Sequence, residues 1–106
     1  MKVKTPLGNL PVRYGMNALR KIADDYGISM NEVMQLDLNS RKMGEVFQFV
    51  YHGFLEGARL EGEECKVKSL DDVGDILQDD MKILEKCVEQ FVEDMPQANG
   101  EEVKKK

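Results

Sequence analysis

The sequence from residue 43 to residue 62, MGEVFQFVYHGFLEGARLEG, is the most apolar stretch of helical length in the chain. At about 100° per residue, a helix over this stretch gathers its apolar side chains on one broad face and leaves a narrow polar strip. The face comprises Met43, Val46, Phe47, Val50, Tyr51, Phe54 and Ala58, and the strip comprises Glu45, Gln48, His52, Glu56, Arg59 and Glu63. Neighbours must cover most of such a helix, which predicts a helical domain packed around it.

Two glycines, Gly53 and Gly57, lie four residues apart within this helix. Each weakens an isolated helix by about 1 kcal/mol relative to alanine. Because both positions lack a side chain, another backbone can come close, and the pair predicts a packing notch. The same spacing is a dimer motif in lipid. Here, charged residues interrupt the run before the roughly 20 apolar residues that a membrane-spanning helix needs.

The N-terminal segment, residues 2–14, is the only part of the chain that favours β structure. Extended pieces around Val3 and Val12 are separated by residues 6–9, PLGN, which suit a turn and resist a helix. We therefore expect a small hairpin. Pro11 lacks an amide donor and belongs at a sheet edge or at a strand start.

Helical periodicity begins after the hairpin, with a first helix predicted over residues 16–26. Gly27 follows directly and is a typical C-terminal stop. Ser29 begins a second helix, and Glu32 completes a capping box with it. This helix is predicted to be short and to end near Asp37.

Capping residues predict where the remaining helices begin. Asn39 or Ser40 is expected to cap the central helix, and Ser69 to begin a short helix after it. The last helix is predicted to carry one apolar stripe, formed by Met81, Leu84, Cys87, Val88, Phe91, Val92 and Met95. Pro96 is predicted to end it. The sequence thus predicts a mainly α domain over residues 1–96, with about five helices and a short N-terminal β-hairpin, followed by a flexible tail over residues 97–106.

Composition and charge narrow the function classes. The chain has 106 residues, of which 42% are hydrophobic and 33% charged, with a formal net charge of −5. An acidic chain offers no general electrostatic footprint for nucleic acid or for an anionic membrane, so neither is expected as a partner. The N-terminus, Met-Lys-Val-Lys-Thr-Pro, lacks the apolar core of a signal peptide. We expect a cytoplasmic protein.

The residues that could support catalysis or bind a metal form no familiar pattern. Cys65, Cys87 and His52 could in principle supply three zinc ligands, but their spacing matches no familiar site, and His52 is expected to be solvated. Acidic residues occur in pairs, as Glu63-Glu64, Asp71-Asp72 and Asp79-Asp80. These pairs fall in a loop or at helix starts, where solvated acids are common. We therefore expect no enzyme activity, no cofactor and no metal.

Residues 18–36, ALRKIADDYGISMNEVMQL, have the outline of a helix-turn-helix motif. Two helices joined at a glycine are what that motif requires. The second helix, however, would present Asn31, Glu32 and Gln35 with no lysine or arginine to contact phosphate. An ordinary corner between two helices is the favoured interpretation, and a DNA-binding regulator remains an alternative.

Several short motifs follow one another along the chain. They are Leu10-Pro11-Val12-Arg13-Tyr14 with Met16-Asn17-Ala18-Leu19, then Tyr26-Gly27-Ile28-Ser29, then His52-Gly53-Phe54 with Gly57, and finally Ser69-Leu70-Asp71-Asp72-Val73. In this order they resemble the tail assembly chaperones of long-tailed bacteriophages and of their prophage and gene-transfer-agent relatives. The resemblance covers residues 1 to about 96, and its motifs are hydrophobic patterns and turn residues without a catalytic signature.

The resemblance implies a non-enzymatic helper in the cytoplasm of a bacterial host. Members of that family bind the tape measure protein, keep its apolar helical segments from aggregating, and help tail tube subunits polymerise around it. They leave before the virion is complete. A structural tail or connector subunit is the second alternative, and the sequence is compatible with self-association.

A chaperone that holds an amphipathic helix needs exposed apolar side chains. The residues that flank the apolar face of the central helix, Phe49, Leu55 and Leu60, are predicted to be the exposed binders. Flexible methionines could also line a groove, at Met16, Met30, Met34, Met43, Met81 and Met95. For any single one of these methionines, a place in the core is the favoured interpretation.

Overall fold

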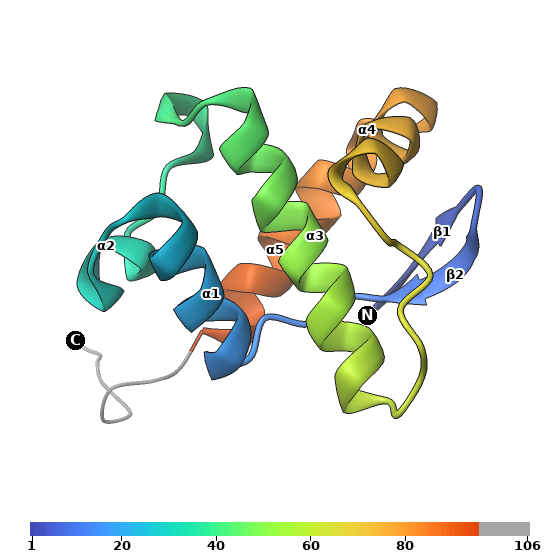
Figure 1. The fold of residues 1–106 in the computed structure, drawn as a ribbon, viewed down its shortest axis with the longest axis horizontal. Coiled ribbons are helices and arrows are strands. Elements are labelled where there is room, and N and C mark those ends of the chain that lie inside the picture. Colours follow the sequence, from blue (N-terminus) through green and yellow to red (C-terminus); the bar gives the residue numbers. More distant parts are fainter. Residues whose placement is uncertain (96–106) are drawn as a thin grey trace.

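The computed structural model describes residues 1–95, and all of the predicted tail lies outside them. Within this part the chain is mainly helical, with five α-helices, one short 3-10 helix and a two-stranded hairpin, which confirms the predicted fold class. The elements are β1 (Lys2–Thr5), β2 (Gly8–Pro11), α1 (Met16–Tyr26), α2 (Met30–Met34), η1 (Leu38–Ser40), α3 (Met43–Leu60), α4 (Leu70–Asp79) and α5 (Lys82–Asp94). Figure 1 shows α3 at the centre, with α1 and α4 on either side and α5 behind it.

The predicted hairpin is confirmed, with antiparallel pairing from Lys2 opposite Pro11 to Thr5 opposite Gly8. Gly8 supplies the positive φ of 113° that the turn requires. The hydroxyl of Thr5 donates to the carbonyl of Gly8 at 2.8 Å and closes the turn. Alternate residues point inward, so that Val3 is buried against the core.

Helix α1 begins and ends at the predicted residues, and α2 begins where it is predicted to begin. Gly27 ends α1 in the left-handed region at φ 67°, and Ser29 and Glu32 form the predicted capping box. Two boundaries were predicted wrongly. Helix α2 ends at Met34 instead of near Asp37, and Lys42 precedes α3 in the place expected for Asn39 or Ser40.

The reason for the shifted start of α3 is a local 3-10 turn. The side chain of Asp37 accepts the amide of Asn39 at 3.0 Å, and the hydroxyl of Ser40 donates back to the carbonyl of Asp37 at 2.8 Å. Both expected caps therefore lie within η1, and α3 starts after it.

The two glycines of α3 form the predicted notch, and the segment that follows β2 crosses the helix there (Figure 1). A Cβ atom at Gly57 would overlap the backbone of Pro11 and Val12, and one at Gly53 would overlap the phenol of Tyr14. The carbonyl of Gly53 accepts the amide of Arg13 at 3.0 Å. This crossing ties the hairpin to the central helix.

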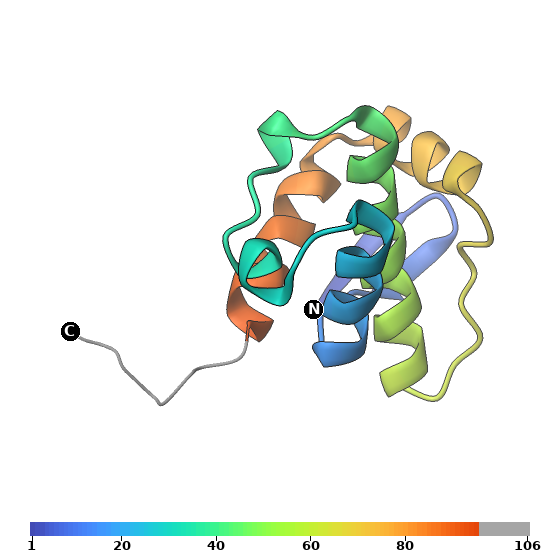
Figure 2. The same ribbon diagram turned by 60° about the vertical axis from the view of Figure 1, so that its left-hand side comes forward.

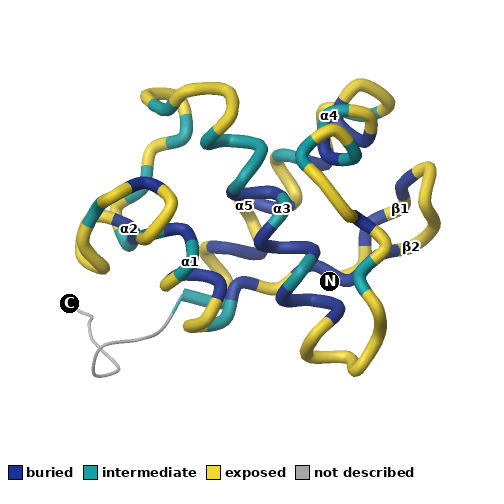
Figure 3. Tube along the Cα trace, viewed as in Figure 1, coloured by how far each residue is buried: buried dark blue, intermediate teal, exposed yellow. Residues whose placement is uncertain are grey.

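An aromatic cluster fills the core beneath the crossing. The ring of Tyr14 stacks on Phe49 with centroids 4.7 Å apart, and Phe91 meets both rings edge-on. The hydroxyl of Tyr14 donates to the carbonyl of Phe49 at 2.9 Å. A buried phenol needs such a partner. Figure 3 shows much of the tube at the centre of the molecule, around the labels of α3 and α5, in the dark blue of buried residues.

Helix α4 begins at the predicted cap, where Ser69 accepts the amide of Asp72 at 3.2 Å. The stripe predicted for α5 is wrong in part, because Val88 and Val92 are exposed while Gln90 is buried. The carboxylate of Asp94 explains this rotation. It accepts the side chain of Arg13 and the amide of Tyr14, each at 2.9 Å, and so turns this side of α5 toward the crossing.

The polar strip of α3 is also more buried than predicted, because α1 lies alongside it (Figure 2). His52, expected to be solvated, is 9% exposed, and its Nε2 atom lies 2.6 Å from the carboxylate of Asp25 in α1. Glu56 is 4% exposed and accepts two hydrogen bonds from Arg59, at 2.8 and 3.1 Å. Its carboxylate lies against Gly15 at the start of α1, where negative charge is favourable.

Candidate functional site

Several hollows lie on the surface formed by the described residues. The principal hollow with the largest volume is a groove between the start of α3, the second half of α4 and the start of α5. Its volume is about 440 Å³. It is lined by Arg41, Met43, Val46, Phe47, Gly74, Leu77, Gln78, Met81 and Leu84. We call this set the methionine groove. Six of its nine lining residues carry large apolar side chains, so an apolar partner fits it best.

Two exposed methionines stand at the edges of the methionine groove. Met43 is 74% exposed at the start of α3, and Met81 is 61% exposed directly before α5. The placement of both in the core, favoured from the sequence, is therefore wrong. Methionine side chains are flexible and adapt to partners of different shape, so these edges suit a binding surface.

The floor of the methionine groove depends on Gly74. A Cβ atom at Gly74 would lie 3.3 Å from the ring of Phe47, so the missing side chain lets that ring lie against α4. Leu77 is buried beneath, and Val46 is half-buried beside it. The glycine that weakens α4 therefore has a packing role, which the sequence did not reveal.

Arg41 is held at one end of the methionine groove. Its guanidinium lies 4.8 Å from the centre of the Tyr26 ring and 3.7 Å from the carboxylate of Glu45. Tyr26 in turn donates its hydroxyl to the carbonyl of Glu45 at 2.6 Å. Burial is the main cause that raises the pKa of Tyr26 well above its ordinary value, so the phenol remains a donor. These contacts fix the wall formed by the start of α3.

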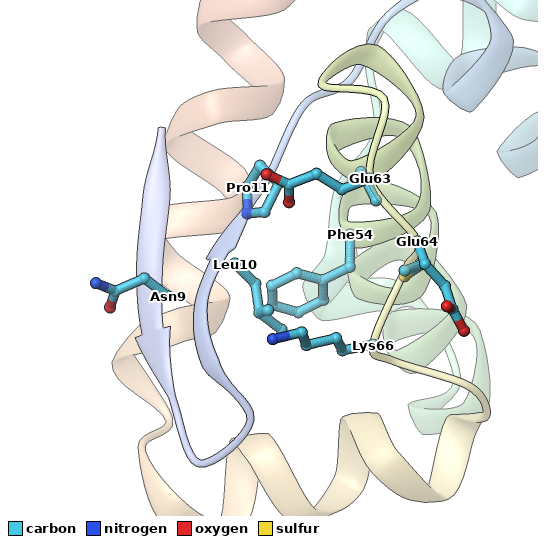
Figure 4. Close-up of a pocket in the computed structure, with 9 residues that line it drawn as sticks. Asn9, Leu10, Pro11, Phe54, Glu63, Glu64 and Lys66 are labelled. Carbon is cyan, nitrogen blue, oxygen red and sulfur yellow. The ribbon is translucent and has the colours of Figure 1, made fainter.

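Two of the smaller hollows lie beside β2 and beside η1. Figure 4 shows one between β2 and the loop after α3, where the ring of Phe54 points toward Leu10 and Lys66 lies beside it. Its volume of about 40 Å³ is too small for a helix. The other, of about 180 Å³, lies between η1 and α5 and includes Leu38 and Val88.

The three residues predicted as exposed binders do not form one surface. Phe49 is 0% exposed, so its assignment to an exposed binding surface is wrong. The segment before α1 and helix α5 cover the flank of α3 that the helical wheel left open, through Tyr14 and Phe91. Leu55 is half-buried and Leu60 is exposed, and neither lines the methionine groove. A binding role for these two stays a prediction.

The remaining methionines separate into two kinds. Met16 and Met30 are exposed at the starts of α1 and α2, away from the lining of the methionine groove. Met34 and Met95 are half-buried and pack against the core. Met43 and Met81 are thus the methionines of the predicted set that share a groove.

The cysteines have the environment of structural residues. Burial raises the pKa of Cys87 to about 12, and it also raises the pKa of Cys65 above its ordinary value. Both thiols therefore stay protonated near neutral pH, which disfavours nucleophilic chemistry. In residues 1–95, no group of three or more histidine, cysteine or acidic side chains is arranged to hold a metal ion.

The outline of a helix-turn-helix motif reduces to α1 and the five-residue α2. Asn31 and Glu32 of α2 are exposed, and so is Gln35 directly after it. The carboxylate of Glu32 accepts the amide of Ser29 at 3.0 Å and so belongs to the cap. Helix α2 thus presents an acidic and amide surface, which is unsuited to the phosphate backbone.

No helix in the described part of the chain combines the length and the apolar character needed to cross a membrane. Comparisons with protein-family models, with curated proteins and with solved structures found no match to the chain.

Proposed function

We propose that this chain is a non-enzymatic tail assembly chaperone of the long-tailed bacteriophage type, which holds an apolar helical segment of the tape measure protein in the methionine groove. The observation that carries the proposal is the open apolar groove with Met43 and Met81 exposed at its edges. Exposed apolar surface of this kind is typical of interaction sites. The resemblance in the sequence supplies the identity of the partner.

The shape of the methionine groove supports a helical partner. Its walls are three helices, and an amphipathic helix can lay its apolar face between them. The side chains at the edges, Met43 and Met81, can move to accept successive apolar segments of different sequence. A long tape measure protein offers many such segments, so adaptable contacts suit a chaperone better than a rigid pocket does.

Tail tube subunits are the second partner that the resemblance implies. The exposed side chains outside the methionine groove, Val92 and Leu60 among them, offer further apolar surface for such a contact. Binding to the tape measure protein is the primary activity in this proposal, because the methionine groove is the feature best suited to it.

A co-expression experiment tests the proposal. The tagged chain is produced with the tape measure and tail tube proteins encoded beside it, and the captured proteins are identified by mass. A double variant, Met43→Glu with Met81→Glu, places charge in the methionine groove and is expected to reduce capture of the tape measure protein at least tenfold. The matched control, Met16→Glu with Met30→Glu, changes two exposed methionines elsewhere and should leave capture unchanged.

Three results would overturn the proposal. Capture of neither tail protein by the unmodified chain would remove its basis. Retention of the chain on DNA in a salt-dependent manner would favour the regulator. Presence of the chain in purified finished particles would favour a structural tail or connector subunit, because a chaperone leaves before completion.

A further inference from the structure

We infer that the occupant of the methionine groove is an amphipathic helix with lysine or arginine along one edge of its apolar face, and that this basic edge lies against α4 and α5. This inference rests on the proposed function and specifies the chemistry of the segment that is bound. Its basis is the unequal distribution of charge around the methionine groove.

The wall formed by α4 and α5 carries acidic residues at its rim, next to the groove lining but outside it. Asp71 and Asp75 each lie one helical turn before a residue of the groove lining, and Glu85 lies one turn after Met81. All three are exposed. Within residues 1–95, none of the three carboxylates has an ion-pair partner. A partner cation would therefore meet carboxylates that no side chain in this part of the chain neutralises.

Basic residues on the same two helices face elsewhere. Lys82 and Lys86 belong to α5 and, like Glu85, are absent from the groove lining, but they lie further around the helix from it. Glu85 is about 100° around α5 from Leu84, whereas each lysine is about 160° from it. Both lysines therefore lie on the far side of α5 from Leu84, which lines the groove. They do not cancel the acidic wall where a partner would sit.

The opposite wall, at the start of α3, has a different charge. Arg41 lines the methionine groove, and its ion pair with Glu45 offsets its charge. Lys42 is exposed next to Met43. This wall is thus neutral to weakly basic, so a helix with cations on both edges would fit less well than one with cations on one edge.

The charge of the whole chain disfavours a second copy as the occupant. The formal net charge is −5, and the wall formed by α4 and α5 would face another acidic molecule. Like charges brought together across an interface oppose association. A basic amphipathic helix satisfies both the apolar floor and the acidic wall.

Synthetic peptides test the inference with the full chain. One probe is an amphipathic helical peptide of about 20 residues, with leucine on its apolar face and lysine along one edge. The second probe carries glutamate in place of each lysine. Isothermal titration is expected to show at least tenfold tighter binding of the lysine peptide, and this difference should shrink as salt is raised.

Charge reversal locates the effect. The variant Asp71→Lys, Asp75→Lys, Glu85→Lys is expected to weaken binding of the lysine peptide about tenfold or more and to strengthen binding of the glutamate peptide. If the reversed variant fails to fold, a neutral version, Asp71→Asn, Asp75→Asn, Glu85→Gln, replaces it. The neutral version should lose less affinity for the lysine peptide than a full charge reversal would.

A matched control separates local from overall charge. Glu63, Glu64 and Glu93 are exposed and stand away from the methionine groove, since Glu63 and Glu64 follow the far end of α3 and Glu93 lies about two turns of α5 beyond Glu85. Their replacement by lysine changes the net charge by the same amount as the reversal on the wall. This control should retain most of the affinity for the lysine peptide, because the distance screens its charges.

The outcomes distinguish this inference from the proposed function. Equal binding of the two peptides, or equal losses in the reversal and in its control, would overturn the inference. If the tape measure protein is still captured through Met43 and Met81 in that case, the proposed function stands without a charge rule. If self-association is seen in place of peptide binding, the inference is wrong.

Discussion

The two halves of α3 differ in how closely neighbouring segments pack against the helix. Around Gly53 and Gly57, a crossing backbone lies directly on the helix, and the neighbouring Tyr14 and Phe49 are buried. Around Met43, the same helix is open, and the nearest apolar side chains form the walls of a groove. We call these regions the closed end and the open end of α3.

We therefore expect the two ends of α3 to have different roles, one in the stability of the fold and one in binding. At the closed end, backbone atoms and rigid rings fix one geometry, since a close contact between main chains tolerates no added atom. At the open end, flexible side chains remain exposed and their arrangement can change with a partner. Stability should therefore respond to the closed end, and binding to the open end.

The largest effect is expected from an added methyl group at the closed end. Gly57→Ala would press a Cβ atom against the backbone of Pro11 and Val12, which cannot move aside as a side chain can. Alanine favours the helix by about 1 kcal/mol, but the overlap outweighs this. We expect a net loss of about 2 kcal/mol in the free energy of unfolding, measured with urea.

Gly44→Ala is the matched control at the open end of the same helix. A Cβ atom there meets nothing within 4 Å. The variant should gain up to about 1 kcal/mol from helix propensity. Equal effects of Gly44→Ala and Gly57→Ala on stability would contradict the comparison.

A smaller effect with a defined pH dependence is expected at Asp94. Burial raises the pKa of this carboxyl, but hydrogen bonds from Arg13, Tyr14 and Gln90 outweigh burial and hold the pKa below its ordinary value of 3.8. A lowered pKa stabilises the folded chain above the ordinary value, and this contribution is lost as the pH falls through the folded-state pKa. Asp94→Asn should cost about 1 kcal/mol at pH 7, because Arg13 is partly exposed and solvent weakens the pair.

Urea unfolding of both forms at several pH values checks this prediction. The stability difference between the unmodified chain and Asp94→Asn should be full at neutral pH and should shrink below the ordinary pKa. A difference that stays constant into strong acid would show that the carboxylate charge is not its source.

The smallest effect on stability is expected at the open end. Met43→Gln with Met81→Gln changes exposed side chains and should alter the free energy of unfolding by no more than about 0.5 kcal/mol. Val50→Ala, a buried residue of the same helix, should cost about 2 kcal/mol. Thermal and urea unfolding of the two variants would show whether the methionines serve the fold after all.

The sequence predicted the closed end better than the open end. Glycines four apart within an apolar helix indicate a close approach whichever segment supplies the neighbour, so the notch could be expected from Gly53 and Gly57 alone. The burial of His52 depends on Asp25 of α1, and that of Phe49 depends on Phe91 of α5. Periodicity within one helix does not report which other helix covers each flank.

The methionine groove depends even more on the arrangement of separate helices. The sequence identifies Met43 and Met81 as flexible residues that could line a groove. They share one groove only because α4 and α5 pack on the start of α3. The contact between Gly74 and Phe47 is of the same kind, since it joins two helices. Local patterns predict elements, whereas such a site requires their mutual placement.

The most direct test of the central claim is a methionine footprint with and without the tape measure protein. Peroxide converts exposed thioethers to sulfoxides, and mass spectrometry measures the rate at each position. The account predicts that the partner slows oxidation of Met43 and Met81 several-fold while Met16 and Met30 react as before. Equal protection of all four, or protection of Met16 and Met30 alone, would contradict the assignment of binding to the open end of α3.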